Sequence, residues 1–261
     1  MPNPRNVSKQ LYHLAESCWA DVKDQTYDLA VLPWGAVEPH NYHLPYATDV
    51  FEAEAVALES ARQAWEHGAR PVVLPTIPWG VNTGQLDLKL CLNMMPSTQM
   101  VILKDLVENL IRHGIRKLVI VNSHGGNSFT TMIRELSVTH PELFICCLDW
   151  WKACDAAAWF DEPGDHAGEL ETSVMMHLVP DLVLPLELAG DGASKSFKIE
   201  ALKKRWVWAQ RQWTSITDST GVGNPQKASA EKGKQFLAAV TKQIAGFVVE
   251  LAASDLNEMY E

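Results

Sequence analysis

The segment Leu32–Asp49 reads LPWGAVEPHNYHLPYATD and begins at the end of a short apolar run. It carries Glu38, His40, His43 and Asp49 within a dozen residues. Carboxylate and imidazole groups together suit divalent ions such as zinc, manganese or iron. A loop at the end of a rigid strand can direct such groups at one point. The segment therefore predicts a buried strand that ends in a metal-binding loop; the alternative is a polar loop whose histidines have no such role.

Short β-branched runs recur along the chain and alternate with longer helical patterns. Each run is apolar on both faces, and we expect strands at Leu29–Leu32, Pro71–Leu74, Lys117–Asn122 and Leu143–Leu148. Such strands belong to a mostly parallel sheet that is covered on both faces. The pattern predicts an α/β fold, a three-layer sandwich with a mostly parallel central sheet flanked by helices, and a single domain over residues 1–261.

Apolar residues at helical spacing lie between and after these runs. They predict helices at Val50–His67, Thr98–His113 and Ser128–Thr139, one from near Gly168, and one at Ser229–Leu251. For the helix at Thr98–His113, Ser97 is a candidate N-cap and Gly114 a candidate C-terminal stop.

The stretch Leu184–Gly223 lacks clear periodicity and holds Trp206, Trp208 and Trp213 among basic and polar residues. Tryptophan is enriched at protein interfaces. A surface insertion or an oligomer contact is therefore favoured over the alternative, a substrate lid.

Composition excludes some classes of function. The chain has 261 residues, 47% of them hydrophobic and 21% charged, and a net charge of −10. A negative protein is a poor partner for nucleic acid, whose binding depends on neutralised phosphates. We find no targeting leader and no apolar run of about eighteen residues, the length that a membrane span needs. We expect a soluble, cytoplasmic protein with a small-molecule substrate and no membrane partner.

A second polar cluster follows the expected strand at Lys117–Asn122 and reads NSHGGN, residues 122–127. Its glycines let the backbone turn sharply and approach a ligand closely. The start of the next helix presents free N–H groups to an anion or oxyanion. Because ligands bind at this edge of an open α/β sheet, we expect His124 at the site and N–H groups near Gly125 and Asn127 to stabilise an oxyanion.

A third cluster, DHAGELETS, occupies residues 165–173 at the start of an expected helix. His166 lies just before the helix and is free to exchange a proton near neutral pH. Glu169 and Glu171 are two residues apart and diverge on a regular helix, so we expect different roles for them. Acidic residues also favour a helix start for electrostatic reasons alone, which is the alternative for Glu171.

Three strand-to-helix junctions thus each offer candidate ligands. Their number exceeds what one tetrahedral zinc with an open position needs. It suits two metals that share a carboxylate and a water, with the water made acidic enough to attack at neutral pH. Asp49 is the natural bridge, because a short carboxylate at a helix start can hold one metal on each oxygen.

Four motifs carry a resemblance to a known family. Gly35 to Pro45, with Asp49 after it, matches G-x-x-E-x-H-x-x-H-L-P and a following Asp. NSHGGN matches N-G-H-G-G-N with Ser123 in place of a glycine, and His166–Ser173 matches H-A-G-E-x-E-T-S without change. GVGNPQKASAEKG, residues 221–233, matches a late G-V-x-G-x-P and A-S-x-E-K-G. From Leu32 to about Gly233 the chain resembles the creatininase (creatinine amidohydrolase) family of metal-dependent amidohydrolases.

The resemblance implies two divalent metal ions per chain (zinc, manganese or iron), with the ligands Glu38, His40, Asp49, His124 and Glu169. It implies that Asp49 bridges them and that His166 gives or takes a proton; we expect Glu171 to orient His166. Family members commonly form ring-like homo-oligomers, often hexamers, so we expect a homo-oligomer.

The chain departs from creatininase itself in the placement of one carboxylate. Creatininase has a glutamate two residues after the histidine of the second motif, where this chain has Gly126, and it lacks the glutamate that stands here as Glu169. On this comparison a carboxylate has moved between loops and serves the same metal. The chain follows the broader family, which weakens the case for creatinine as the substrate.

Aromatic and bulky residues are expected to line the site. Trp34, Trp79, Trp150 and Trp151 fall at or just past predicted strand ends, and creatininase has a tryptophan corresponding to Trp151. Aromatic walls suit a flat, ring-bearing substrate. We expect Trp150 and Trp151 to contact the substrate, together with His43, which lies in the first loop among bulky residues. The alternative for the four tryptophans is that they fill the hydrophobic core.

These observations predict a metal-dependent amidohydrolase that cleaves a C–N bond other than a peptide bond, in a small cyclic amide or a formamide, by a metal-bridged hydroxide. One alternative is a metal-dependent enzyme that cleaves or isomerises a sugar-like or hydroxy-ketone substrate. The other is a non-catalytic family member that binds metal as a sensor or assembly subunit. Intact candidate ligands at all three junctions argue against the non-catalytic alternative.

Overall fold

The computed structural model describes residues 10–261, which hold four strands: β1 Leu29–Trp34, β2 Pro71–Val73, β3 Lys117–Asn122 and β4 Phe144–Asp149. The strands form one parallel sheet in the order β2-β1-β3-β4. Trp34 pairs with Asn122, and Asn122 pairs with Asp149. The carboxyl ends of β1, β3 and β4 therefore lie level at one edge of the sheet. The predicted parallel α/β sheet is confirmed.

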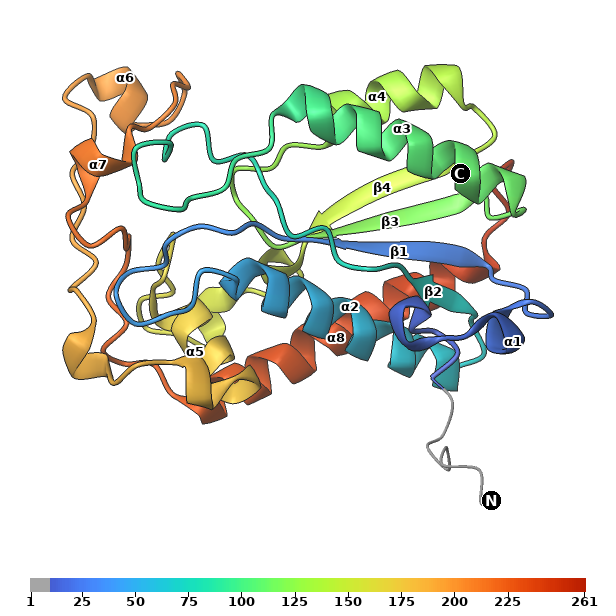
Figure 1. The fold of residues 1–261 in the computed structure, drawn as a ribbon, viewed down its shortest axis with the longest axis horizontal. Helices are drawn as coiled ribbons and strands as arrows, with labels where there is room; N and C mark the ends of the chain where they lie inside the picture. The colour runs from blue at the N-terminus through green and yellow to red at the C-terminus, as the bar shows by residue number, and fades with distance from the viewer. Residues whose placement is uncertain (1–9) are drawn as a thin grey trace.

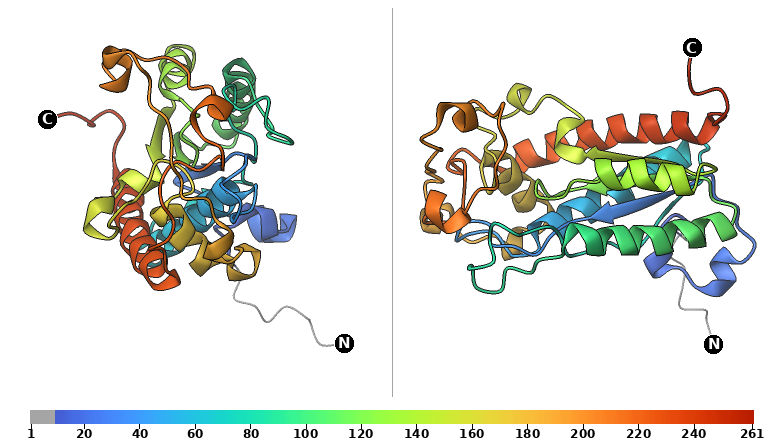
Figure 2. Two further views of the ribbon diagram at one scale, coloured as in Figure 1. Left: turned by 90° about the vertical axis from the view of Figure 1, so that its left-hand side faces the viewer. Right: turned by 90° about the horizontal axis from the view of Figure 1, so that it is seen from above.

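Helices cover both faces of the sheet and complete three layers (Figures 1 and 2). One layer contains α2 Thr48–Glu66, α5 Glu169–Leu178 and α8 Ala230–Ala253. The opposite layer contains α3 Pro96–Arg112 and α4 Thr130–Thr139. The sandwich predicted from the apolar runs is therefore present.

Two hydrophobic clusters account for strands that are apolar on both faces. Leu29 and Val31 of β1 belong to the cluster on the α2 and α8 side. Ala30 and Leu32 belong to the cluster on the α3 side. Successive side chains of a strand leave on opposite faces, so every position of a doubly covered strand must be apolar. The same alternation continues in β3.

The long helix α8 is apolar enough, by length and composition, to pass for a membrane-spanning helix. Its buried residues include Phe236, Val240, Ile244 and Val248, which recur at helical spacing. These residues belong to the hydrophobic cluster that α8 shares with α2 and α5. Core helices of soluble proteins have this composition too, and packing against α2 and α5 accounts for it here.

Most predicted elements are present, with differences at their ends. β1 continues to Trp34, β2 ends at Val73, and β4 begins at Phe144 and continues to Asp149. The prediction that Ser97 caps α3 is wrong, because Met95 holds the N-cap position without a side-chain bond and Pro96 is already helical. Proline suits that first position since it has no N–H to leave unpaired. Gly114 follows α3 with a φ of +77°, as expected for a helix stop.

The stretch Leu184–Gly223 consists of loops and short helices beyond the carboxyl ends of the strands (Figure 1). It contains α6 Glu200–Lys203, α7 Trp213–Ile216 and a 3-10 turn at Leu186–Leu188. The remaining short elements are α1 Trp19–Val22 and 3-10 turns at Leu14–Glu16, Trp150–Lys152, Ala156–Ala158 and Pro180–Leu182.

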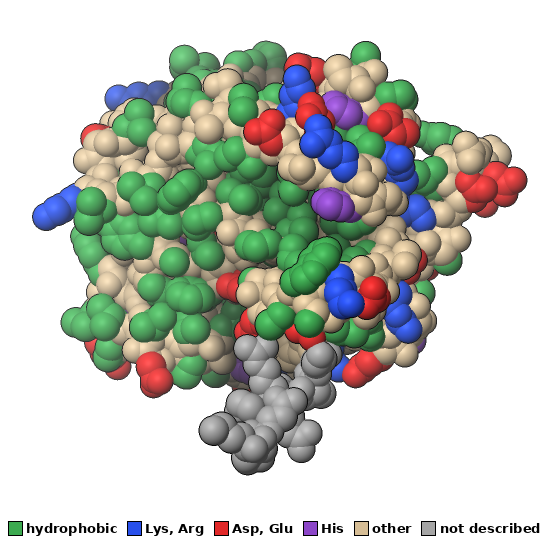
Figure 3. Space-filling model, turned by 45° about the vertical axis from the view of Figure 1, so that its right-hand side comes forward, with side chains coloured by type: hydrophobic (Ala, Val, Ile, Leu, Met, Phe, Trp, Pro, Cys, Tyr) green, Lys and Arg blue, Asp and Glu red, His purple; other side chains and the backbone are tan. Residues whose placement is uncertain are grey.

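One face of the molecule carries a broad area of hydrophobic side chains with few charges between them (Figure 3). Apolar areas on a protein surface are typical of contacts between chains. The homo-oligomer expected from the sequence stays a prediction, and this area is consistent with it.

Candidate metal centre

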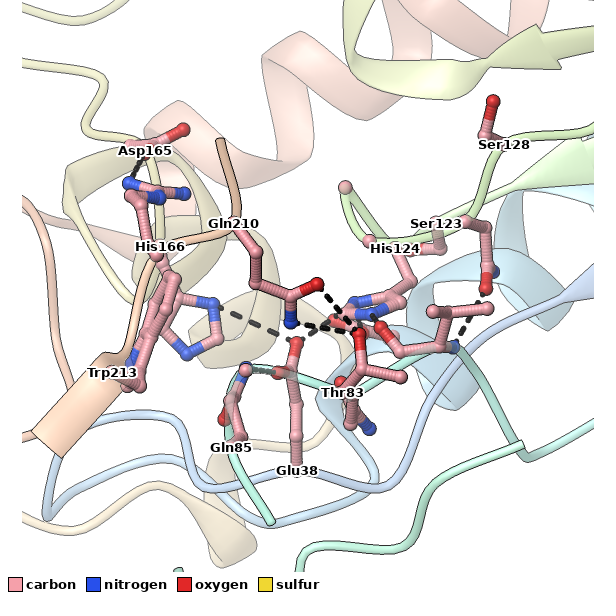
Figure 4. Close-up of a pocket in the computed structure, with 18 of the residues that line it drawn as sticks. Glu38, Thr83, Gln85, Ser123, His124, Ser128, Asp165, His166, Gln210 and Trp213 are labelled. Carbon is pink, nitrogen blue, oxygen red and sulfur yellow. Dashed lines mark hydrogen bonds and ion pairs between the residues drawn. The ribbon is translucent and has the colours of Figure 1, made fainter. Parts of the chain in front are cut away.

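A cavity of about 650 Å³ lies at the carboxyl edge of the sheet. All three polar clusters of the sequence contribute to its wall, together with residues 81–85 and 208–211 and Trp213. From the clusters come Glu38, Asp49, Ser123, His124, Gly125, Gly126, Asn127, Asp165, His166 and Glu171. Parallel strands bring such loops to one edge, which is why distant segments meet here. Figure 4 shows Glu38, His124 and His166 facing the same space.

Asp49 is the centre of the cluster. Its Oδ1 lies 2.9 Å from Nε2 of His40, and its Oδ2 lies 3.1 Å from Nδ1 of His124. The same His124 nitrogen lies 2.9 Å from Oε1 of Glu38. Each carboxylate oxygen of Asp49 thus faces a different histidine.

Two groups of candidate ligands share Asp49. One comprises Glu38, Asp49 and His124, and the other comprises His40, Asp49 and Glu171. Within each group the ligand atoms lie within 4.8 Å of one another. A further group joins Glu38 and His40 to His166. The arrangement has the ligand types and the shared carboxylate of a two-metal site.

Backbone carbonyls fix how the histidines face this cluster. Nδ1 of His40 lies 3.0 Å from the Glu38 carbonyl oxygen, and Nε2 of His124 lies 3.1 Å from the Val81 carbonyl oxygen. A carbonyl can only accept, so each of these nitrogens donates its hydrogen. The other nitrogen of each ring is left facing Asp49. Metal-binding histidines are commonly oriented by such bonds.

Local packing explains why the first loop reaches Asp49. A Cβ on Gly35 would lie 2.7 Å from the backbone nitrogen of Val50, in the first turn of α2. Only glycine lets the chain leave β1 in such close contact with the start of that helix. The loop that carries Glu38 and His40 therefore lies directly against the turn that carries Asp49.

The carboxylates of the cluster have no lysine or arginine partner among the described residues. Glu38 and Asp49 are buried, and within residues 10–261 no Lys or Arg pairs with either of them or with Glu171. Buried charge of one sign is costly without a compensating ion. This excess of buried negative charge fits two divalent cations, as does the set of oxygen and nitrogen donors.

Burial and close neighbouring charges shift the pKa values of the candidate ligands. Burial acts to raise the pKa of Glu38, but the neighbouring charges of His124, His166 and His40 lower it overall. Burial acts to lower the pKa of His40, and the charge of Asp49 outweighs it, so the pKa rises to about 10. Burial raises the pKa of Glu171. Histidines must lose a proton to bind a metal, so metal binding here releases protons.

The predicted ligand Glu169 does not lie in the cluster, and this corrects the sequence-based assignment. Its carboxylate binds the ammonium group of Lys232 and accepts a hydrogen bond of 2.8 Å from the Glu162 N–H. The partner predicted to orient His166, Glu171, lies instead with His40 and Asp49. Glu169 at the first position of α5 turns toward α8, whereas Glu171, two residues on, turns toward α2.

Gly126 could not carry the glutamate that creatininase has at this place. A Cβ there would lie 2.3 Å from the Val81 carbonyl oxygen and 2.4 Å from Nε2 of His124. Both neighbours are held by the hydrogen bond between them. A carboxylate for the second ligand group must come from another segment, and Glu171 of α5 is the one that lies there.

His166 lies beside the cluster with one ring nitrogen free. Its Nε2 donates to the Pro39 carbonyl oxygen at 2.9 Å, while Nδ1 lies 3.8 Å from Oε1 of Glu38. Its ring packs against His40 and edge-on against Trp213, with centroids 4.2 and 5.3 Å apart. The free Nδ1 therefore faces the cavity beside the candidate ligands.

The predicted substrate contacts divide into two groups. Trp150, Trp151, Gly125 and Asn127 line the cavity. His43 does not: it is buried, and its Nε2 lies 2.9 Å from the hydroxyl of Thr172. The prediction that His43 contacts the substrate is therefore wrong.

Asn127 cannot offer its own N–H to an oxyanion, because that group donates to the His124 carbonyl oxygen at 3.1 Å. The N–H groups of Gly125 and Gly126 have no acceptor among the described residues. These two glycines, rather than Asn127, keep free donors at the cavity wall.

The other tryptophans lie in different environments, and only some of them line the cavity. Trp34 is fully buried in the core on the α3 side, and Trp79 is half exposed and does not line the cavity. Residues 208–211 and Trp213, from the stretch expected to be a surface insertion, do line it. Gln210 exchanges hydrogen bonds with Thr83 across the opening (Figure 4). The stretch therefore serves as part of the cavity wall.

Sequence reasoning missed two polar residues at the site. Gln85 donates a hydrogen bond to Oε2 of Glu38. Glu52 is buried behind the cluster, accepts a bond of 3.3 Å from the Ser123 hydroxyl, and has its pKa raised by burial and by the charge of Glu171. The sequence pattern could have identified Glu52, because it is an acid three residues after Asp49 on the buried face of α2. No sequence pattern identifies Gln85, which lies in an irregular loop.

Comparison with known proteins shows the family of the chain. Residues 15–248 match the family model described as "Creatininase: Creatinine amidohydrolase". A mycofactocin precursor peptide peptidase of Mycobacterium ulcerans (strain Agy99) is 28% identical over 223 residues, covering 82% of this chain and 81% of that protein. A creatinine amidohydrolase of Pseudomonas putida is 29% identical over 176 residues, covering 59% and 65%.

Solved structures share the whole fold. A creatinine amidohydrolase-like protein of Bacteroides fragilis NCTC 9343 superposes with a TM-score of 0.91 at 42% identity, covering 97% of this chain and 100% of that one. A manganese form of creatininase has a TM-score of 0.77 at 23% identity, covering 93% and 99%; at that identity the likeness concerns the fold alone. With the match to the family model over most of its length, the chain belongs to the creatininase family.

Proposed function

We propose that the protein is a metal-dependent amidohydrolase that cleaves a C–N bond other than a peptide bond in a small cyclic amide or a formamide. One observation carries the proposal: the two carboxylate oxygens of Asp49 face two different groups of candidate metal ligands. Family membership supports a hydrolase, because its model is named for creatinine amidohydrolase.

Glu38, Asp49 and His124 would hold one ion, and His40, Asp49 and Glu171 the other. Solved creatininases include a manganese form and a form with a zinc pair, which supports these metals here, with iron as a third possibility by ligand type. Two such ions would polarise the substrate carbonyl and lower the pKa of a water that they bind.

His166 would move the proton. Because its Nε2 donates to the Pro39 carbonyl, its Nδ1 is the atom that can take a proton and pass it to the departing nitrogen. Packing against His40 and Trp213 holds the ring in place. The N–H groups of Gly125 and Gly126 would stabilise the oxygen that gains charge.

The test begins with the metal content of untagged protein purified without chelators, measured by elemental mass spectrometry. We expect two metals per chain, followed by release of amine or carboxylate from a panel of cyclic amides and formamides. Essentially no metal after reloading would overturn the proposal in favour of a non-catalytic protein. Rearrangement of a sugar-like substrate without amine release would favour the isomerase or lyase alternative.

Replacing His166 by Ala separates a proton carrier from a ligand. We expect turnover to fall by about two to four powers of ten while both metals remain bound. Loss of a metal in this variant would make His166 a ligand, in line with its proximity to Glu38 and His40.

A second candidate is cleavage of a peptide bond. The mycofactocin precursor peptide peptidase of M. ulcerans matches more of this chain than the P. putida creatinine amidohydrolase does. The cavity of about 650 Å³ is also roomier than a small cyclic amide requires. Short peptides should therefore be added to the panel of cyclic amides and formamides. Hydrolysis of the peptides, with no activity on cyclic amides, would favour this candidate.

A further inference from the structure

A second cavity, of about 350 Å³, adjoins the candidate metal centre. The two cavities share Asp165, Trp208, Ala209 and Arg211 in their walls. The two cavities therefore adjoin at these residues, and a ligand that extends past them from Asp49 would reach the second cavity.

The second cavity is basic although the protein is acidic. Lys195, Lys203 and Arg205 line it. Residues 195–211 hold six basic side chains and a single acid, Glu200, in a chain whose net charge is −10. Such a local reversal of charge marks a surface that attracts anions.

The three cations at this cavity have no side-chain partner in the part of the chain that the structure describes. Among the ion pairs and side-chain hydrogen bonds of residues 10–261, none involves Lys195, Lys203 or Arg205. The acid in the wall, Asp165, is already neutralised by Arg211, whose Nη1 lies 2.6 Å away. Like charges gathered without a counter-charge repel one another, and a bound anion relieves that repulsion.

Apolar residues lie beside the cations in the same wall. Phe197, Leu202, Ile216 and Val222 line the cavity. An anion carried on a hydrocarbon or aromatic body fits this combination better than a fully oxygenated phosphate. The arginine fork and the two ammonium groups suit a carboxylate at its end.

The segment that carries the cations is fastened at both ends. The Lys195 N–H donates to the Ile216 carbonyl oxygen at 2.7 Å, and the Trp213 N–H donates to that of Gly84 at 2.9 Å. Gln210 bonds to Thr83 beside the first cavity, as Figure 4 shows. The basic residues are thus held beside the metal centre by contacts with the rest of the fold.

We infer that the cavity lined by Lys195, Lys203 and Arg205 binds a carboxylate group of the substrate while the scissile amide lies beside Asp49. The inference rests on the proposed function and narrows its substrate class to amides that carry a carboxylate on an apolar body. The carboxylate then sets both affinity and the orientation of the amide.

Hydroxamates provide a probe, because they chelate divalent metals and can carry a tail. The series has a hydroxamate at one end, a straight hydrocarbon chain of increasing length, and either a carboxylate or a carboxamide at the other end. Isothermal titration calorimetry on metal-loaded protein measures each pair. At the length that spans the cavities we expect the carboxylate to bind roughly tenfold to a hundredfold more tightly, as charge-assisted hydrogen bonds allow.

Two sets of substitutions test the assignment. The variant Lys195→Gln/Lys203→Gln/Arg205→Gln should lose the carboxylate advantage and still bind acetohydroxamate as before. The control Lys198→Gln/Lys204→Gln removes charge from the same segment at residues outside the cavity wall and should keep most of the advantage. Raising the salt concentration gives a check without mutation, because screening should shrink the advantage in the unmodified protein.

Equal affinities of carboxylate and carboxamide at every length would overturn the inference, as would an advantage that survives in the triple variant. Either result, with acetohydroxamate still binding, leaves the metal centre intact. Failure of acetohydroxamate to bind the metal-loaded protein would instead overturn the proposed function, and the inference with it.

Discussion

Two glutamates in the first turn of α5 have opposite roles although they stand two residues apart. Glu169 binds Lys232 of α8, and Glu171 lies with His40 and Asp49. In a helix, positions two apart point in directions that differ by more than a right angle, so each meets a different neighbour. Which of the two faces the cluster depends on how α5 is rotated about its axis.

Replacing each glutamate by glutamine should separate these roles. We expect Glu171→Gln to lose one metal per chain, because a neutral amide is a poor ligand for a divalent ion. Glu169→Gln should keep both metals and lower the melting temperature, since it leaves the Lys232 ammonium without its anion. Elemental analysis with thermal melts checks both variants; loss of a metal only in Glu169→Gln would restore the sequence-based assignment.

His43 should make the metal-free protein sensitive to acid. Burial, with the charge of His40, lowers its pKa to about 4 from an ordinary value of 6.5. The folded state thus binds fewer protons than the unfolded state, so the stability that it contributes is full above pH 6.5 and is lost as the pH falls toward 4.

The measurement for His43 is the melting temperature at pH 7 and pH 5 in the presence of a chelator. The unmodified protein should lose more between the two values than His43→Gln, whose amide can still bond to Thr172. An equal loss in both proteins would show that His43 does not titrate in this range.

At the scale of elements, the contact between α5 and α8 places Glu171. The Ser229 N–H donates to the hydroxyl of Ser173 at 3.1 Å, and the Ser229 hydroxyl caps α8. A Cβ on Gly233 would lie 2.0 Å from the Ser173 carbonyl oxygen. The late motif ASAEKG therefore matches three contacts with α5: the hydrogen bond from Ser229 to Ser173, the ion pair of Lys232 with Glu169, and the close approach of backbones at Gly233.

Gly233→Ala should destabilise the protein through this contact. Added volume in a closely packed interface costs about 1–3 kcal/mol, and here it would push α5 away from α8. Metal affinity should fall too, because Glu171 moves with α5.

Gly246→Ala is the matched control, since Gly246 lies in the same helix with open space around its Cβ. Alanine there should raise stability by about 0.5–1 kcal/mol through helix propensity alone. Chemical denaturation measures both variants; equal effects would show that α8 does not approach α5 as closely as described.

At the scale of the whole molecule, the fold brings several negatively charged carboxylates together at the site. Glu38 and Asp49 come from the loop after β1 and the start of α2, and Glu171 comes from α5. Folding brings these carboxylates together at a place where no lysine or arginine of residues 10–261 pairs with them. The metal-free fold therefore bears an electrostatic cost that bound cations remove.

Chelation should lower the melting temperature, and added metal should raise it with the logarithm of its concentration relative to the dissociation constant. Asp49→Asn should remove most of this rise, because Asp49 belongs to both groups of candidate ligands. With a chelator it should also melt below the unmodified protein, because it loses the buried interaction by which the charge of Asp49 raises the pKa of His40 to about 10. If the melting temperature of the unmodified protein is the same with and without metal, the assignment of the cluster as a metal site is wrong.

Much of this architecture follows from local sequence. The four strands are short apolar runs because both faces of the sheet are buried, and the helices are long amphipathic patterns, so both could be located within a few residues. The cap of α3 was misplaced because Pro96 is as good a helix start as Ser97 is a cap. The ends of elements depend on such small differences of free energy.

The sequence by itself determined the parallel α/β sheet, the three polar loops at its carboxyl edge, and the residue types of a metal site, since periodicity and motif spacing are local properties. Only the tertiary structure decided that Glu171 rather than Glu169 joins His40 and Asp49, and that His43 is buried against Thr172. It also decided that residues 208–211 and Trp213 line the cavity. Each of these depends on contacts between distant segments, such as Glu169 with Lys232, 63 residues away. Side-chain direction at such places is set by the packing of whole helices, which no local pattern encodes.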